Sequence, residues 1–427
     1  MLWVRPLRKP LPGSCDLRNL AVNVAMKYRL RCVHCGKEFS PEPDLYTCPD
    51  CKDRLGTLEV IYSFSSKTQW IRPENPGIWR YADLLPIRED PLPPHLYVGN
   101  TPLIRSEKIE RELGIQELWI KDDGKNPTAS FKDRASVVAI AKAIEYGYTD
   151  IFAASTGNAA SSLAGLCAPA GLKAHIYLPA TAPEAKIAQL LIYGAEVFAV
   201  QGSYDQAFDL SLKEGFQKDW YCRNSAINPY LLEGKKTGTF ELIQDLKMHA
   251  PDLILVGVGD GTVYSSIHKA VAELFQLNLI DRIPIIVGVQ GENANAIRRA
   301  FSNGEPYLPA DIENATCLAD SISVGKPRDV IKACQWAKKH DGFFLTVSDE
   351  EIGVSISALA RKSGVFAEPA GAIAYAGLKQ LKDEGHLNAK ARVALMITGN
   401  GLKDVRAAKP YLTEKVTPVS IKGVRGA

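Results

Sequence analysis

The sequence lacks an apolar run of about 18 residues or more, which a membrane-spanning helix would require. It also lacks an excess of charge of either sign, because 51 lysines and arginines stand against 48 aspartates and glutamates. A formal net charge of +3 in 427 residues provides little electrostatic attraction to nucleic acid or to a membrane surface. We therefore expect neither of these partners.

Two further absences concern the compartment of the protein. Residues 1–27 are basic and contain prolines but have no continuous apolar segment, which argues against a secretory signal. We interpret them as a loosely ordered extension, with a presequence as the alternative. Five of the nine cysteines are scattered and mostly in apolar surroundings, which indicates buried thiols rather than a disulfide framework. We therefore expect a cytoplasmic location.

The order of apolar segments predicts an α/β protein. The composition is that of a globular protein, with 46% hydrophobic and 23% charged residues, and the length predicts two or three domains. Beyond a linker at 66–76, strand-like and helix-like segments alternate, as in parallel sheets flanked by helices. The predicted strands are Glu117–Lys121, Ala174–Leu178, Glu196–Val200, Leu253–Val258, Pro284–Val289 and Arg392–Ile397. We expect two packed α/β lobes with a cleft between them.

A small separate module precedes these lobes. Between Tyr28 and Tyr62 the chain is rich in Cys, Pro, Asp and Gly, and it has too few apolar residues to fold on a core of its own. Two C-x2-C pairs stand twelve residues apart, and their members are Cys32, Cys35, Cys48 and Cys51. This spacing predicts a structural Zn²⁺ site with four thiolate ligands and no open coordination position. Two disulfides are the alternative.

The most informative segment is Asn126–Arg134, which places Lys132 in a short polar turn before a helix. Residues 135–143 combine helix-forming residues with apolar spacing. Near a helix N-terminus the dipole disfavours the protonated form of a lysine, so this amine is suited to form a Schiff base with a carbonyl group. Taken alone, the segment is also compatible with a solvated lysine between charged neighbours.

A second polar loop, at residues 155–158, interrupts a short apolar strand and an Ala-rich helix. Gly157 permits a tight turn, and the backbone N–H groups at the start of the helix can hold a carboxylate. Asn158 adds a neutral side-chain donor. Helix capping by Ser155 or Thr156 is the alternative interpretation.

A third loop, at residues 257–263, joins an apolar strand to a helix and is rich in glycine. Its amides would point at an anion and its glycines allow close approach, so we expect a phosphate here. The loop lacks the full G-x-G-x-x-G pattern and the P-loop lysine, which argues against dinucleotides and nucleoside triphosphates.

A fourth segment, Met396–Asp404, places Thr398 directly after a strand, where it would face the same cleft. An unrelated surface turn is the alternative. One cofactor, pyridoxal phosphate, accounts for all four segments. Its aldehyde suits Lys132 and its phosphate suits the glycine-rich loop. Its phenolic oxygen suits Asn158, and its ring nitrogen suits Thr398.

Together these motifs resemble the threonine synthase branch of the fold type II pyridoxal-phosphate family, which includes tryptophan synthase β-subunits and serine/threonine dehydratases. The resemblance runs from about Trp79 through Gly99-Asn100-Thr101-Pro102-Leu103 to Asp404. The N-terminal zinc ribbon also recurs in part of that family. We expect an extension at 1–27, the ribbon at 28–65, a large cofactor-binding domain at 66–134 and 221–427, and a small domain at 135–220.

The resemblance implies a role for each segment. Lys132 would be the catalytic residue, linked to the cofactor and moving protons. Asn158 would bond the pyridoxal oxygen, and Thr398 would meet the pyridine nitrogen. The cofactor phosphate would lie on a loop made of Gly259, Asp260, Gly261, Thr262 and Val263. The substrate carboxylate would lie on a loop that includes Ser155, Thr156, Asn158 and Ala159.

The implied reaction converts a small amino-acid substrate, O-phospho-L-homoserine, and water to L-threonine and phosphate, as a carbon–oxygen lyase does. The chain departs from the family pattern at three places. Ala129 stands where glycine is usual, and the glycine-rich loop has Asp and Thr where Asn and Gly are frequent. Leu231 stands where an arginine would bind the substrate phosphate, and Arg223 and Lys235 are the candidates to replace it.

Two other functions therefore stay open. One is a different pyridoxal-phosphate reaction on the same scaffold, such as that of a serine/threonine dehydratase or a β-replacement enzyme. The other is a catalytically silent protein whose zinc ribbon binds nucleic acid or a protein partner. The sequence also leaves the oligomeric state open, a homodimer included.

Overall fold

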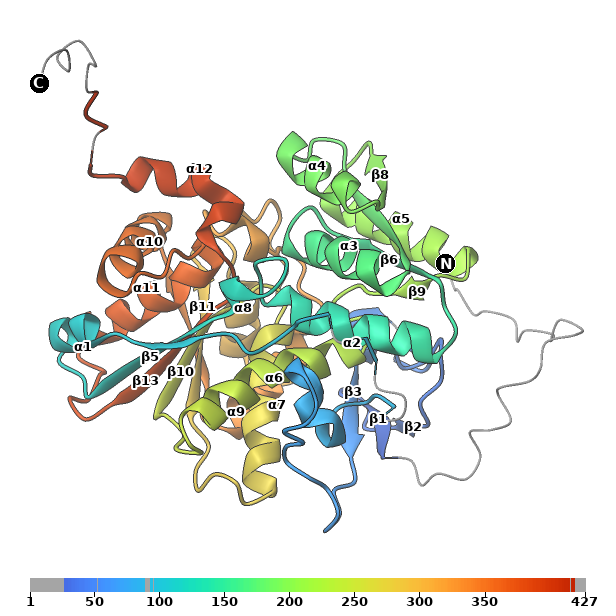
Figure 1. Ribbon diagram of the computed structural model, residues 1–427, viewed down its shortest axis with the longest axis horizontal. Coiled ribbons are helices and arrows are strands. Elements are labelled where there is room, and N and C mark those ends of the chain that lie inside the picture. Colours follow the sequence, from blue (N-terminus) through green and yellow to red (C-terminus); the bar gives the residue numbers. More distant parts are fainter. Residues whose placement is uncertain (1–26, 52, 89–92, 95, 415, 419–427) are drawn as a thin grey trace, which may run out of the picture.

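Apolar segments spread along the chain form two parallel-rich sheets, one in each of two lobes (Figure 1). The computed structural model describes residues 27–51, 53–88, 93–94, 96–414 and 416–418. Of the predicted extension at 1–27, all but Lys27 lies outside the described residues.

The larger sheet has six strands in the order β12-β11-β10-β13-β5-β4. They are β4 (Leu103–Arg105), β5 (Glu117–Asp122), β10 (Leu253–Gly257), β11 (Ile285–Gly291), β12 (Phe343–Val347) and β13 (Arg392–Ile397). All neighbours are parallel except β4 and β5. Along β13, Val393 and Leu395 join the apolar cluster on one face, whereas Ala394 and Met396 join the cluster on the other. Both faces are buried, which explains the nearly continuous apolar strands.

Helices cover both faces of this sheet (Figure 1). One face packs against α1 (Glu107–Leu113), α10 (Asp349–Ser363) and α11 (Pro369–Asp383). The other packs against α6 (Tyr230–Asp245), α7 (Thr262–Gln276), α8 (Ala296–Asn303) and α9 (Val330–Lys339). The short α12 (Val405–Ala408) contacts α10 near the end of the described chain.

The smaller sheet has four parallel strands in the order β8-β7-β6-β9. They are β6 (Asp150–Ala154), β7 (Lys173–Pro179), β8 (Glu196–Val200) and β9 (Tyr221–Cys222), accompanied by α3 (Asn158–Ala170), α4 (Glu184–Ile192) and α5 (Tyr204–Gln217). Helix α2 (Lys132–Glu145) packs against α3 in this lobe and against α6 in the other. Because β9 belongs to this sheet, we propose that the small lobe ends at Cys222 rather than at residue 220. The other domain boundaries stay a prediction.

The N-terminal module is a three-stranded antiparallel sheet in the order β2-β1-β3. Its strands are β1 (Tyr28–Cys32), β2 (Glu38–Phe39) and β3 (Leu58–Tyr62). The hydroxyl of Tyr62 donates a hydrogen bond to Glu233 Oε2 on α6, at 2.8 Å. The ammonium of Lys269 on α7 donates to the carbonyl of Val60. The module is therefore docked through β3 on the helical face of the large lobe.

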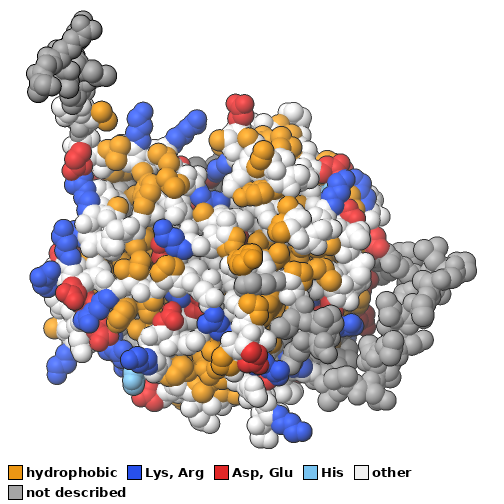
Figure 2. Space-filling view, viewed as in Figure 1, with side chains coloured by type: hydrophobic (Ala, Val, Ile, Leu, Met, Phe, Trp, Pro, Cys, Tyr) orange, Lys and Arg blue, Asp and Glu red, His pale blue; other side chains and the backbone are white. Residues whose placement is uncertain are grey.

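The predicted α/β fold with parallel-rich sheets is confirmed, and all six strands predicted for the two lobes are present with bounds that differ by two residues or fewer. No helix in the described part of the chain has the length and apolar character that would let it span a membrane. On the face drawn in Figure 2, basic and acidic side chains are interspersed, in line with the small net charge.

Candidate active site

The four polar segments singled out in the sequence line one cavity of about 270 Å³. Lys132, residues 155–159, residues 257–263 and Thr398 all contribute to its wall. The reason lies in the sheets, because β6 ends just before the second segment, and β10 and β13 end within the first two residues of the third and fourth. In parallel sheets the loops that follow the carboxyl ends of the strands gather at one edge.

Backbone hydrogen bonds hold the lysine turn against the turn after β13. The N–H of Phe131 donates to the carbonyl of Thr398 at 2.9 Å, and the N–H of Asn400 donates to the carbonyl of Ala129 at 3.1 Å. Helix α2 begins at Lys132, directly after this contact. These bonds hold the start of α2 next to the turn after β13, and Lys132 and Thr398, far apart in the sequence, line the same cavity.

The surroundings of Lys132 favour its neutral form. Burial lowers the pKa of this lysine, and the nearby Arg223 guanidinium lowers it further, while the carboxylates of Glu368 and Asp260 act in the opposite direction. A neutral amine is the form that attacks a carbonyl and that accepts a proton from carbon.

The departure at Ala129 carries a conformational cost. Ala129 has φ of +63°, in the left-handed region that glycine adopts without strain. For a residue with a Cβ this conformation costs about 1–2 kcal/mol. The turn is held in place by the hydrogen bond to Asn400 and by the N–H of Thr128, which donates to Asp133 Oδ2 at 2.7 Å.

Asn158 begins α3, and its side chain contacts a carboxylate that the sequence analysis missed. Its Nδ2 donates to Glu368 Oε1 at 2.7 Å. Glu368 precedes α11 and is 5% exposed, and burial raises the pKa of its carboxyl. A Cβ at Gly399 would lie 2.2 Å from the same Oε1, so this carboxylate needs a glycine opposite it. The only sequence signal was an acidic residue directly before a proline at a helix start.

The hydroxyl side chains in the loop expected to hold a carboxylate do not cap helix α3. The N-cap of α3 is Gly157, with no side-chain capping bond, and the hydroxyl of Ser155 instead accepts the N–H of Gly157 at 3.2 Å. The capping interpretation of Ser155 and Thr156 is therefore wrong. The first N–H groups of α3, at Asn158 and Ala159, have no acceptors within the helix and lie at the cavity wall.

The glycine-rich loop has the geometry of an anion site. Gly261, with φ of +96°, is the N-cap of α7, so the N–H groups of the first turn open into the cavity. A Cβ at Gly259 would lie 2.9 Å from a neighbouring Cα. Among the described residues the buried hydroxyl of Thr262 has no hydrogen-bond partner. The loop therefore offers unpaired donors at the position where a cofactor phosphate is expected.

The carboxylate of Asp260 lines the same cavity, and one of its oxygens is held by a backbone N–H from outside the loop. Its Oδ1 accepts the backbone N–H of Arg328 at 2.7 Å. Burial raises the pKa of Asp260 to about 6, although the Arg328 cation acts to lower it. The structure thus accommodates an acidic residue where the family usually has asparagine.

Pyridoxal phosphate fits this donor set. The orphaned hydroxyl of Thr262 and the α7 amides suit its phosphate, the amine of Lys132 suits its aldehyde, and Thr398 supplies a hydroxyl. Within the part of the chain that the structure describes, that hydroxyl donates one long hydrogen bond, 3.3 Å, to the carbonyl of Ala370. It retains capacity to meet a ring nitrogen.

The three residues discussed for the substrate phosphate have different positions. Leu231 is fully buried in the apolar core beside α2. Arg223 and Lys235 both line the cavity. The chain therefore lacks a cation at position 231, and two other basic residues lie in the cavity wall.

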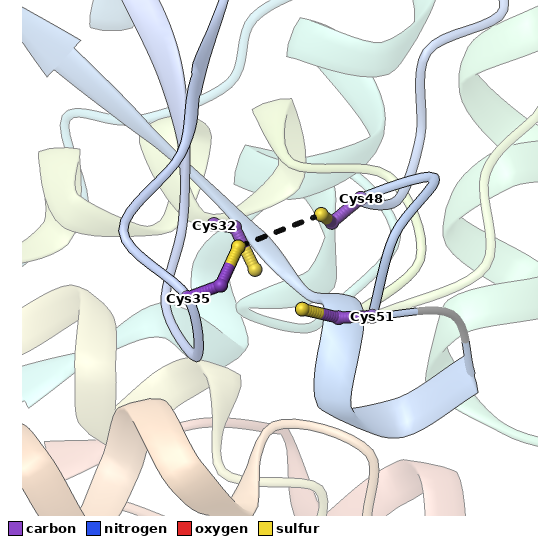
Figure 3. Close-up of side chains that lie close together, drawn as sticks. All are labelled: Cys32, Cys35, Cys48 and Cys51. Carbon is purple, nitrogen blue, oxygen red and sulfur yellow. Dashed lines mark hydrogen bonds between the residues drawn. The ribbon is translucent and has the colours of Figure 1, made fainter.

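The four cysteines of the N-terminal module also converge (Figure 3). Their sulfur atoms all lie within 4.8 Å of one another, with Cys35 Sγ and Cys48 Sγ 3.8 Å apart. Four thiolates at 2.3 Å from a tetrahedral Zn²⁺ would stand about 3.8 Å from one another. All eight described cysteines are free thiols. The cluster has the donor type and spacing of a closed four-thiolate site.

Comparison with known proteins places this site in a family. The fold and the cavity define a pyridoxal-phosphate-dependent enzyme of fold type II, and the family model described as "Pyridoxal-phosphate dependent enzyme" matches residues 95–399. The threonine synthase of Methanocaldococcus jannaschii is 38% identical over 88% of this chain and 93% of its own length. The threonine synthase of Methanosarcina acetivorans is 36% identical over 94% of this chain and 98% of its own. The chain belongs to the threonine synthase family of pyridoxal-phosphate-dependent enzymes.

Solved structures with the same fold extend beyond that family. A fungal L-serine ammonia-lyase from Rhizomucor miehei superposes with a TM-score of 0.64 at 17% identity, over 73% of this chain and 96% of that one. Threonine deaminase isoform 2 from Solanum lycopersicum superposes with a TM-score of 0.61 at 19% identity, over 72% and 82%. At these identities the likeness concerns the fold alone.

Proposed function

We propose that this chain is a threonine synthase that converts O-phospho-L-homoserine and water to L-threonine and phosphate. The observation that carries the proposal is the amine of Lys132 at the start of α2, in a cavity walled by all three of the other polar loops. Sequence identity of 33–38% to threonine synthases over most of the chain supports the same reaction.

Each loop has a proposed binding role. The loop from Gly259 to Val263 holds the cofactor phosphate with its amides, and Thr398 meets the pyridine nitrogen. Asn158 bonds the phenolic oxygen, in an orientation set by its contact with Glu368. The N–H groups that begin α3 hold the substrate carboxylate, with the hydroxyls of Ser155 and Thr156 beside them.

Lys132 performs the proton transfers in this proposal. Pyridoxal phosphate, when bound, supplies an electron sink for negative charge at the substrate Cα. The lowered pKa of Lys132 suits its amine to accept the Cα proton and then a Cβ proton, whose removal expels phosphate, and suits the resulting ammonium to return protons to Cγ and Cα. Phosphate leaves from Cγ, and water adds at Cβ.

Turnover with purified, cofactor-loaded protein tests this function. We expect phosphate release and threonine formation from O-phospho-L-homoserine, with turnover lost in Lys132→Ala. Formation of a 2-oxo acid from threonine or serine, without turnover of the phosphorylated substrate, would instead identify an ammonia-eliminating enzyme. A normal cofactor absorbance band in the wild type makes either result interpretable.

We further propose that Cys32, Cys35, Cys48 and Cys51 bind one structural Zn²⁺. The converging free thiols support this assignment. Elemental analysis is expected to give one zinc per chain, and Cys35→Ser is expected to lose it. An unchanged zinc content in that variant would contradict the assignment. A cytoplasmic location and a homodimer stay predictions.

A further inference from the structure

Two basic side chains in the cavity, Lys235 and Arg223, have no carboxylate within ion-pair distance among the described residues, although Asp260 and Asp329 attract Lys235 and Asp133 attracts Arg223 from farther away. Lys235 and Arg223 are each 1% exposed. Within the described residues, the side chain of Lys235 makes neither a hydrogen bond nor an ion pair. Arg223 donates from Nε to the hydroxyl of Ser136 at 3.1 Å, but its buried Nη2 has no partner. A buried cation without a partner is costly, so its retention points to a ligand that supplies the missing charge.

None of the described acidic groups around the cavity forms an ion pair with Lys235 or Arg223, although Asp260 lies in the cavity wall and attracts Lys235 from farther away. Asp260 accepts the backbone N–H of Arg328. Asp320 pairs with Lys186 at 3.0 Å. Asp329, which lies behind the loop and attracts Lys235 at a distance, pairs with Lys332 at 2.9 Å.

The remaining cation at the wall also has partners of its own. The guanidinium of Arg328 lies 3.5 Å from Asp205 and 3.6 Å from the ring centroid of Phe208. Lys235 and Arg223 are therefore the two cavity cations, besides Lys132, that lack a carboxylate partner among the described residues.

The helix geometry relates Lys235 to the departure at Leu231. The two residues are four positions apart on α6, so they share one face of the helix. Long side chains on a helix point back towards its N-terminus, over the preceding turn. The ammonium of Lys235 is thus directed towards the turn of Leu231, where the family places its arginine.

We propose that Lys235 and Arg223 together bind the phosphate group of the substrate, in place of the arginine usual at position 231. The inference rests on the proposed function, because a substrate with a phosphate ester brings a second dianion into a cavity that already receives the cofactor phosphate. The amides of α7 and the hydroxyl of Thr262 serve the first phosphate. Lys235 on α6 and Arg223 after β9 serve the second.

Substitution of Lys235 tests this assignment in the cofactor-loaded enzyme. In Lys235→Gln we expect the KM for O-phospho-L-homoserine to rise about 10- to 100-fold, the loss typical of one buried charge-assisted hydrogen bond. Competitive inhibition by inorganic phosphate weakens by a similar factor, whereas affinity for pyridoxal phosphate, measured by absorbance titration, stays within twofold. Lys235→Arg is expected to keep most of the substrate affinity.

Lys213→Gln is the matched control, since it removes the same charge from an exposed position on α5. If Lys235→Gln does not fold, Arg223→Gln carries the same expectation. An unchanged KM in a folded Lys235→Gln enzyme would overturn the proposal. A loss of cofactor affinity with unchanged KM would also overturn it, because the cations would then serve the cofactor phosphate.

Failure of the proposed function gives a different result. In that case the wild type does not turn over the phosphorylated substrate at all. Calorimetric titration of inorganic phosphate into the cofactor-loaded wild type then still tests the site. Binding that is lost in Lys235→Gln upholds an anion subsite, and equal binding in both proteins rejects it.

Discussion

Lys235 and Lys236 are neighbours on α6, both are buried, and they face opposite surroundings. The Nζ of Lys236 lies 2.6 Å from Glu233 on α6 and 2.7 Å from Glu273 on α7, and 4.2 Å from the ring centroid of Tyr62 in the N-terminal module. Lys235 points into the cavity and has no such partner among the described residues. Two identical side chains, on neighbouring residues of one helix, thus contact different parts of the molecule.

The difference separates charges that serve the fold from charges that serve a ligand. Arg134 belongs with Lys236, because it is fully buried and pairs with Asp123 at 2.6 Å and with Glu241 at 2.7 Å. Such compensated groups lock elements together, here α2 to α6 and the module to the large lobe. An uncompensated group destabilises the protein until its ligand arrives.

The largest effect is expected when the compensated lysine is removed. Lys236→Gln leaves Glu233 and Glu273 without this partner, and breaking a buried ion pair costs about 3–5 kcal/mol. Urea unfolding followed by tryptophan fluorescence measures the loss. The exposed control Lys213→Gln should change the unfolding free energy by less than about 0.5 kcal/mol. Equal losses of unfolding free energy in Lys236→Gln and Lys213→Gln would show that the buried, paired lysine does not stabilise the fold more than an exposed one.

A smaller, pH-dependent effect is expected at Glu241. Burial acts to raise the pKa of this carboxyl, but the Arg134 guanidinium outweighs it and lowers the pKa to about 2. Its stabilising contribution is therefore complete above the unfolded-state value near 4.5 and is lost as the pH falls towards 2. The difference in unfolding free energy between wild type and Glu241→Gln should shrink by about 1.4 kcal/mol per pH unit in that window. A difference in unfolding free energy that stays constant with pH would show that the negative charge of Glu241 does not stabilise the folded protein.

The smallest effect, of opposite sign, is expected at Lys235. Lys235→Met keeps the apolar stem and removes a buried charge without a partner, so the cofactor-free protein should gain about 1 kcal/mol of stability. The same unfolding assay measures it. A loss as large as that of Lys236→Gln would mean that Lys235 also serves the fold.

Much of the candidate site could be predicted from local sequence. Few residue types provide the backbone conformation or the donor that each motif requires. The motifs are the lysine before a helix, the glycine-rich loop after an apolar strand, and the paired C-x2-C spacing. The backbone conformations are present at Gly261 and at the start of α2 with Lys132. The bounds of the six predicted strands could also be predicted from the sequence, because strands buried on both faces appear as continuous apolar runs.

What the sequence alone determined was therefore the predicted strands, the polar and glycine residues of each loop and the family that combines them. Only the tertiary structure decided which polar groups meet and which are left unpaired. Glu368 contacts Asn158 across 210 residues, Asp260 turns to Arg328, and Lys235 differs from Lys236 only in the side of α6 it occupies. Charge compensation depends on distances in space, and those distances are set by the packing of α2, α6 and α7 rather than by any local pattern.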